Sequence, residues 1–420
     1  MRKAKNIFDN IDSFSILLYL ILVVFGIINI YASQYNDDTS FMLNLSSRYG
    51  KQILFSILSL FIAFLILIID WKFFYSLAYI FYIIIILLLI GVLFQGAITG
   101  GASSWFEIGS FKFQPSELAK FITALALARY YNSIYSKKIS VHNKLKTYGI
   151  ILLPFLLIVL QNDLGTAIVF SAFILVLYRE GLSGNILIFG LLAAILFALS
   201  LLIEKILLIS IIGGILFIIL LISKKNKKEL ILVFTIFVIV TSFIFSVNYL
   251  FNNVLAPHQR ARVNIFLGID IDPLGAGYNL IQSKIAIGSG GIIGKGFLNG
   301  TQTRFDFVPE QSTDFIFCTI GEEWGFFGSI FFIITFVGLL VRVLFLAERQ
   351  RSNFSRIYGY SVATILFMHF FINIGMTIGL MPTIGIPLPY ISYGGSSLMG
   401  FTILLFIFLN LDSYRLQILR

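Results

Sequence analysis

Long apolar runs recur along almost the whole chain, separated by short polar segments. Each run is long enough to cross a lipid bilayer as a helix, or nearly so. The runs cover residues 13–34, 51–69, 73–94, 115–131, 147–160, 163–179, 184–203, 206–223, 229–250, 313–344, 354–381 and 394–413. Because lipid admits only helices or closed barrels, and the runs lack alternation of period two, they predict an all-α polytopic membrane protein. We expect a single bundle of about 12 transmembrane helices.

Basic residues set the expected orientation of these spans. The first run, from Ser13 to about Ala32, is longer than the apolar core of a cleaved signal peptide, so we expect a retained first span. If the N-terminus is cytoplasmic and the spans alternate, nearly every inner segment is basic, as the positive-inside rule requires. The inner segments then contain Arg2, Lys3, Lys5, Lys72, Lys137, Lys138, Lys144, Lys146, Arg179, Lys224, Lys225, Lys227, Lys228, Arg349, Arg351, Arg356, Arg415 and Arg420. Both termini are therefore expected in the cytoplasm.

The outer segments are unlike ordinary connectors. Residues 96–114 are rich in glycine and aromatic residues, 251–312 form a long loop, and 381–397 contain three prolines and a Gly-Gly pair. A short fourth segment, 161–165, interrupts apolar sequence at the same face. Long loops in compact proteins are usually functional or disordered, and the mixed composition of 251–312 favours an ordered, re-entrant loop. We predict one transmembrane domain over 1–420, with 251–312 as its large extracytoplasmic loop.

Composition excludes several classes of protein. With 58% hydrophobic and 12% charged residues and a mean hydropathy of +0.96, the chain is too apolar for a soluble domain. The net charge of +10 arises mostly from short basic runs between spans, which set topology, so we expect no nucleic-acid partner. A single cysteine, Cys318, excludes a disulfide within the chain, and three scattered histidines argue against a Cys/His metal site.

The long outer loop carries basic residues that the positive-inside rule disfavours there. They are Arg260, Arg262, Lys284, Lys295 and Arg304, set against Asp270, Asp272, Asp306 and Glu310. One explanation is an anionic ligand at the membrane surface, since arginine and lysine suit phosphate. The alternative is a set of internal ion pairs with the four carboxylates, and composition alone does not decide between them.

Asp314 lies where the long loop becomes the next span, directly after Ser312 and Thr313. Residues of these types are common helix N-caps, and chemistry alone favours the cap. A carboxylate at the edge of the bilayer, beside a basic loop, is also where a general base for a lipid-linked substrate would lie.

Further ionisable residues fall inside or at the ends of apolar helices. Glu117 and Lys120 are three residues apart on the fourth span, so they share a helix face and can pair. Ionisable groups in spans usually face the bundle interior or a water-filled cavity, and a structural pair between helices is the alternative. Asp163, at the outer end of a helical hairpin, is a similar case. We interpret Glu322, Glu323 and His369 as structural or packing residues.

Several motifs, in order along most of the chain, resemble the SEDS family (shape, elongation, division, sporulation). They are Phe113-Gln-Pro-Ser-Glu-Leu-Ala-Lys120, Asp163-Leu-Gly-Thr-Ala167, Asp272-Pro-Leu-Gly-Ala-Gly-Tyr278, Gln282-Ser-Lys-Ile-Ala-Ile-Gly-Ser-Gly-Gly291, Thr313-Asp-Phe-Ile-Phe317, Ile386-Pro-Leu-Pro389 and Ser392-Tyr-Gly-Gly-Ser396. Within the family, residues 385–389 are closer to RodA, the elongation member, than to FtsW, the division member. Asn162 stands where the family usually has proline and Ser312 where it often has histidine. The family usually has about ten spans, so 184–250 are expected to add a helical pair.

The resemblance implies a peptidoglycan glycosyltransferase that polymerises lipid II at the outer face of the cytoplasmic membrane during cell elongation and determines rod shape. It also implies a class B penicillin-binding protein as partner, which crosslinks the new glycan. The family's essential aspartate corresponds to Asp314, and its other charged positions correspond to Glu117, Lys120 and Asp163. With Asp314 as catalytic base, we expect Thr313 and these three residues to bind substrate.

The expected reaction also requires stabilisation of a diphosphate leaving group. We expect Arg260, Lys284 and Arg304 to bind substrate, and a divalent cation, Mg²⁺ or Mn²⁺, to assist, with Asp314 as a candidate metal ligand instead of a base. Two rival functions remain open on sequence grounds. A lipid-linked precursor flippase would use the same intramembrane charges to pass the head group without making polymer. A structural scaffold for a penicillin-binding protein would tolerate loss of Asp314.

Overall fold

The chain folds into two compact units of mostly helical structure. The computed structural model describes residues 10–35, 47–99, 102–108, 111–134, 141–222, 226–269, 275 and 277–416. Its first unit comprises Met1–Arg179 and Asn279–Arg420, and its second comprises Glu180–Tyr278. The prediction of one transmembrane domain over 1–420, with 251–312 as its large outer loop, stays a prediction.

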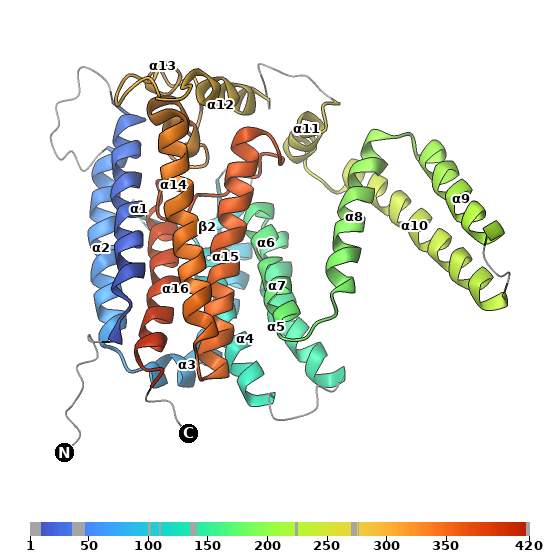
Figure 1. The fold of residues 1–420 in the computed structure, drawn as a ribbon, viewed down its shortest axis with the longest axis horizontal. Helices are drawn as coiled ribbons and strands as arrows, with labels where there is room; N and C mark the ends of the chain where they lie inside the picture. Colours follow the sequence, from blue (N-terminus) through green and yellow to red (C-terminus); the bar gives the residue numbers. More distant parts are fainter. Residues whose placement is uncertain are drawn as a thin grey trace. The chain divides into compact units, whose positions relative to one another are not determined.

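The first unit is a helical bundle whose helices lie side by side (Figure 1). Its helices are α1 (Ser13–Ala32), α2 (Arg48–Ile68), α3 (Trp71–Gln95), α4 (Pro115–Ile134), α5 (Val141–Leu160), α6 (Leu164–Val169), α7 (Ala172–Arg179), α14 (Ile316–Glu348), α15 (Asn353–Ile378) and α16 (Gly395–Ser413), with α12 (Tyr278–Ser289) and α13 (Thr301–Arg304) at one end. The core follows α15 and α16, most of whose residues are buried, whereas few residues of α3 and α5 are buried. Apolar side chains on the outer surface of a helical bundle are suited to contact with lipid.

Every apolar run predicted from the sequence coincides with helix in the structure. Ten helices are long and apolar enough to cross a membrane within the described residues. The run 115–131 corresponds to α4, which buries charged side chains, and the run 163–179 is divided between α6 and α7. The polytopic helical fold is confirmed, while the count of 12 spans stays a prediction.

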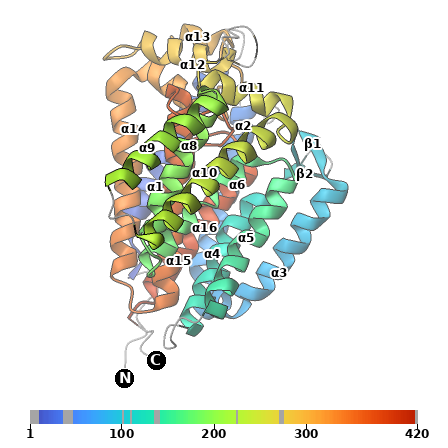
Figure 2. The same cartoon turned by 90° about the vertical axis from the view of Figure 1, so that its right-hand side faces the viewer.

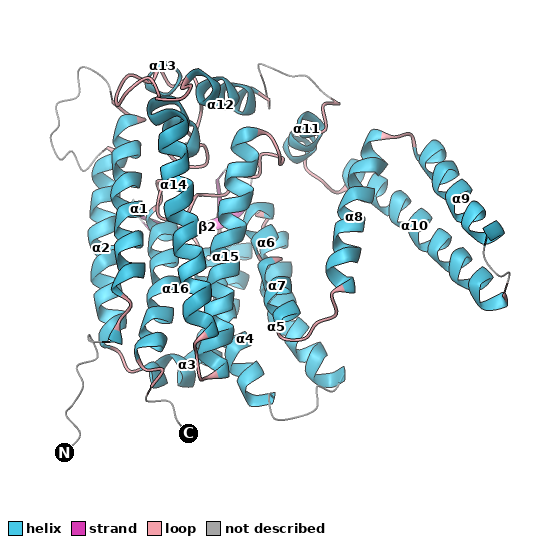
Figure 3. Cartoon of the chain, viewed as in Figure 1, coloured by secondary structure: helices cyan, strands magenta, loops and turns pink. Residues whose placement is uncertain are grey.

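The first outer segment departs from the all-α prediction by forming a small sheet. Strands β1 (Ala97–Thr99), β2 (Ala102–Ile108) and β3 (Phe111–Phe113) form an antiparallel sheet in that order, the only strands in the described parts of the chain (Figure 3). The sheet lies at one end of α3 (Figure 2). The strands pair their backbone N–H and C=O groups with each other. A non-helical segment within a membrane protein needs such partners, because lipid supplies none.

The second unit contains α8 (Asn185–Leu202), α9 (Lys205–Ile222), α10 (Lys227–Asn253) and α11 (Pro257–Phe266). Its first three helices pack against one another and leave most apolar side chains exposed. Three helices coincide with the three apolar runs predicted within 184–250. The extra helical pair expected there stays a prediction.

The long loop is ordered over its described residues and docks on a break in α14. At Gly325 the backbone leaves the helical region, with φ 63° and ψ −153°. The glycine-rich stretch 290–297 supplies hydrogen-bond partners for the backbone groups at this break. Lys295 N–H bonds to Glu322 O at 3.0 Å, and Phe326 N–H bonds to Gly291 O at 3.0 Å. The end that carries α12 and α13 is opposite to the end where α1 begins and α16 finishes (Figure 1).

Candidate active site

Asp314 lies in the turn that precedes α14 and does not cap that helix. The N-cap position belongs to Phe315, with no side-chain cap bond. Neighbouring hydroxyls are engaged elsewhere, since Ser312 Oγ accepts a bond from Arg48 at 2.7 Å and Thr313 Oγ1 donates to Glu310 at 2.9 Å. Asp314 is therefore not the N-cap residue of α14, as the cap interpretation expected.

The turn around Asp314 is bonded to the third outer segment. We call residues 385–394 the proline segment. Tyr393 N–H donates to Ser312 O at 2.8 Å, and Ser392 Oγ donates to Thr313 O at 2.5 Å. The structure thus joins two segments that are about 80 residues apart in sequence.

Gly385 places the backbone of the proline segment close to the carboxylate of Asp314. Its φ is +76°, and a Cβ built there would lie 3.3 Å from Asp314 Oδ2. The left-handed backbone and the close approach both require glycine. Gly165, in α6, packs on the other side, where its own Cβ would lie 3.1 Å from Gly385 O.

For the glycosyltransferase activity that the motif resemblance implies, we expect Gly385→Ala to lower polymerisation on the order of tenfold, because alanine both strains the backbone and displaces Asp314. Initial rates on lipid II measure this. The matched control is Gly181→Ala, which meets a similar backbone constraint at φ +102° with open space around its Cβ. Equal losses in the two variants would show that backbone strain alone explains the effect.

Glu117 and Lys120 form a buried ion pair, as predicted. Lys120 Nζ lies 2.9 Å from both carboxylate oxygens of Glu117, and each side chain is 3% exposed. Lys120 Nζ is also 2.9 Å from His369 Nε2, whose other ring nitrogen lies 3.1 Å from Pro387 O. The pair is therefore connected to the proline segment and belongs to the same region as Asp314.

Asp163 joins the starts of two helices. Its carboxylate caps α6 by accepting from Thr166 N–H at 3.0 Å, and it also accepts from Gln114 Nε2 at 2.9 Å and Ser116 Oγ at 3.4 Å. These bonds fix the first turn of α4, which carries Glu117, against α6. A direct role of Asp163 in substrate binding stays a prediction.

Arg48, at the start of α2, is a functional candidate that the sequence analysis missed. In addition to Ser312, it lies 3.6 Å from Glu310, and its guanidinium is 6.0 Å from the ring of Tyr393. Burial raises the pKa of Tyr393, against the opposing effect of Arg48, so the phenol stays protonated at neutral pH. The signal was an arginine at the outer end of a span, contrary to the positive-inside rule.

The predicted loop cations lie in different surroundings. Lys284 is exposed beside Gly379 at the end of α15, and Arg304 lies over the ring of Tyr35 at 5.6 Å. Arg260 belongs to the second unit, where it donates to Asn252 O at 3.0 Å. The carboxylates Asp270 and Asp272 lie outside the described residues.

Glu322 is structural, as interpreted. It is fully buried and accepts bonds from Lys295 Nζ at 2.6 Å and from the backbone N–H groups of Gln302 and Thr303 at 2.9 Å each. The carboxylate therefore fixes α13 onto α14. Lys295, one of the loop cations, forms its ion pair with a carboxylate of the helix and also donates to Thr301 Oγ1 of the loop at 2.7 Å.

The donor set near Asp314 suits a cation held mainly by substrate. Within the described ranges, no three His, Cys, Asp or Glu side chains cluster as a metal cage would require. Mg²⁺ is often bound by one or two carboxylates together with phosphate oxygens. Asp314 fits such a role, because its carboxylate lies in a turn at the edge of the bundle and is only partly buried.

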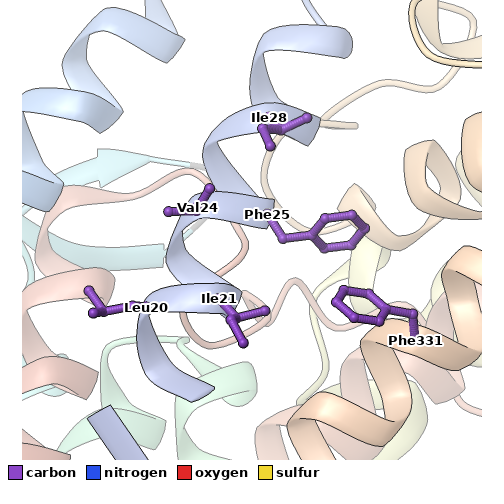
Figure 4. A pocket seen from close by; sticks show the side chains of 6 residues that line it. All are labelled: Leu20, Ile21, Val24, Phe25, Ile28 and Phe331. Carbon is purple, nitrogen blue, oxygen red and sulfur yellow. The ribbon is translucent and has the colours of Figure 1, made fainter. Parts of the chain in front are cut away.

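An apolar pocket of about 340 Å³ lies between α1 and α14 and is separate from these groups. Phe25 and Phe331 face each other across it, and Leu20, Ile21, Val24 and Ile28 complete the lining (Figure 4). Because its side chains carry no polar atoms, it supplies no chemistry. The proline segment contacts α1 through Gly26, where a Cβ would lie 2.8 Å from the backbone of Tyr390 and Ile391.

Comparison with known proteins identifies the family. The model of the FtsW, RodA and SpoVE family, described as cell cycle protein, matches residues 12–211 and 179–417. The chain belongs to this family. The peptidoglycan glycosyltransferase MrdB of Escherichia coli K12 is 37% identical over 319 residues, 76% of this chain and 73% of that protein. The peptidoglycan glycosyltransferase RodA of Treponema pallidum is 33% identical over 422 aligned residues, 93% and 94% of the two chains.

A solved structure supports the same assignment. It is described as the structural coordination of polymerization and crosslinking by a peptidoglycan synthase complex, and it matches with a TM-score of 0.70 at 29% identity. The match covers 97% of this chain and 99% of that chain. The predicted SEDS family membership and RodA-like character are confirmed.

Proposed function

We propose that this family member polymerises lipid II into glycan strands at the outer face of the cytoplasmic membrane, with Asp314 as its catalytic residue. The prediction of a peptidoglycan glycosyltransferase is confirmed by the activity named for MrdB and RodA. One observation supports the choice of Asp314. Its carboxylate does not cap α14 and lies beside Gly385, where the proline segment approaches the long loop.

In the proposed mechanism, Asp314 accepts the proton of the acceptor sugar hydroxyl as that oxygen attacks the anomeric carbon of the donor chain. The bond to undecaprenyl diphosphate breaks, and the leaving group takes the electron pair. Arg48, Lys284 and Arg304 are cations of the same unit that would bind the diphosphate. In the alternative role, Asp314 would hold a divalent cation instead of acting as the base, and that cation would supply positive charge for the leaving group.

The deciding experiment is polymerisation of lipid II by the purified protein, with glycan detected on gels. A polymerase makes chains that depend on Asp314, whereas a flippase makes none. We also propose a class B penicillin-binding protein as partner, since the matched structure is described as coordinating polymerization and crosslinking. Its addition to the assay is expected to raise the rate without replacing the need for Asp314.

The proposal requires Asp314 and the long loop to face outward. In a Cys318→Ser background, cysteine at Asn299 or Ser397 should react with an impermeant thiol reagent in intact spheroplasts, whereas cysteine at Lys228 should react only after permeabilisation. Asn299 is exposed and Cys318 is fully buried, so labelling reports the new thiol. Labelling at position 228 in intact cells would contradict this topology.

A further inference from the structure

Two buried polar side chains, His369 and Asn373, lie one turn apart on α15 and face the proline segment. They are 1% and 0% exposed. An ammonium group can only donate hydrogen bonds, so His369 Nε2 must accept from Lys120 at 2.9 Å. Its Nδ1 therefore carries the proton and donates to Pro387 O at 3.1 Å. The contacts fix the tautomer of the ring.

Asn373 uses its amide to join the proline segment to the turn of Asp314. Its Nδ2 donates to Ile386 O at 2.6 Å and to Asp314 O at 2.8 Å. The Asn373 side chain thus fixes the backbone of Asp314, the proposed base, relative to the backbone of Ile386, which follows Gly385. Together, His369 and Asn373 bind the consecutive carbonyls of Ile386 and Pro387.

The proline segment depends on such donors for a physical reason. Pro387 and Pro389 lack N–H groups, and the segment is not helical, so it cannot pair its own carbonyls in a regular ladder. A buried carbonyl without a partner costs free energy, and no water is expected deep in the bundle. Side chains of α15 supply the missing donors.

We propose that His369 and Asn373 are positioning residues for the glycosyl transfer, and that His369 couples the buried pair Glu117–Lys120 to the placement of Asp314. This inference rests on the proposed function of Asp314. Loss of either side chain releases one carbonyl of the proline segment and lets Gly385 move relative to the carboxylate. Displacement of a reacting group by about 1 Å costs about a hundredfold in rate.

The test compares variants of similar shape in lipid II polymerisation. His369→Phe and Asn373→Leu should lower kcat about a hundredfold with KM changed less than about threefold. His369→Gln should retain most of the wild-type kcat, because its amide can accept from Lys120 and donate to Pro387 O. The matched control is Ser361→Ala, on the same helix, because Ser361 Oγ bonds only to Ile357 O one turn earlier, at 2.9 Å.

Hydrogen exchange separates this inference from the proposed function. His369→Phe and Asn373→Leu should speed amide exchange in the proline segment, where Tyr393 N–H bonds to Ser312 O, and in the turn before α14. Exchange in α3 should stay unchanged. This readout does not depend on catalysis, whereas inactivity of the wild type would refute only the proposed function.

Several outcomes would overturn the positioning role. They are normal kcat in His369→Phe or Asn373→Leu, a rise in KM at unchanged kcat, or exchange no faster than in Ser361→Ala. If His369→Phe does not fold, His369→Gln provides the test of His369. A hundredfold loss of kcat in His369→Gln would contradict the proposed hydrogen bonds.

Discussion

Asp314→Asn is expected to remove nearly all glycan polymerisation while leaving the protein folded. The amide has the size of the carboxylate but cannot accept the proton of the acceptor hydroxyl, and it binds a divalent cation more weakly. Loss of a general base costs about a hundred- to ten-thousand-fold in rate. Because Phe315 occupies the N-cap position of α14, thermal unfolding should change little. Initial rates on lipid II and unfolding curves of the same preparation measure both.

A matched control tests whether the chemical change itself causes the loss. Asp70 caps α3 by accepting from Lys72 N–H at 2.8 Å, and asparagine caps helices about as well. Asp70→Asn should therefore polymerise lipid II at close to the wild-type rate. If Asp314→Asn also retained most of that rate, the catalytic role proposed for Asp314 would be wrong.

The helices could be predicted from the sequence because span length and hydrophobicity are local properties. Each apolar run coincides with helix, and the run 163–179 was located although it divides into two short helices. The pairing of Glu117 with Lys120 was also accessible, because their spacing of three residues fixes a shared face.

The contacts of the site could not be predicted because they join distant segments through backbone atoms. Arg48 bonds to Ser312, 264 residues away, and Asn373 bonds to the carbonyl of Asp314. A carbonyl acceptor has no signature in sequence, so a bond to it follows only from the fold. The N-cap interpretation of Asp314 failed for a related reason, since the turn continues to Phe315 before α14 begins.

The small sheet was missed because its strands are short. Two of them have three residues each, too few for alternation of period two to be evident. Their pairing depends on the turns between them and on contacts such as Ser103 N–H to Gln161 O at 3.0 Å.

Removing both members of the Glu117–Lys120 pair should destabilise the protein by less than the sum of the two single removals. Each single variant, Glu117→Gln or Lys120→Met, leaves the other charge buried in low dielectric, which costs about 3–5 kcal/mol. The double variant removes both charges, so its loss of unfolding free energy should be smaller than the sum of the single losses. Thermal unfolding and the yield of monodisperse protein in detergent measure this.

The matched control is the ion pair of Glu107 and Lys112, with 2.7 Å between the charged atoms and side chains 44% and 52% exposed, where single changes should cost at most about 1 kcal/mol. Additive losses at Glu117 and Lys120 would show that the two residues act independently, and His369 would then have no coupled pair to join to the proline segment.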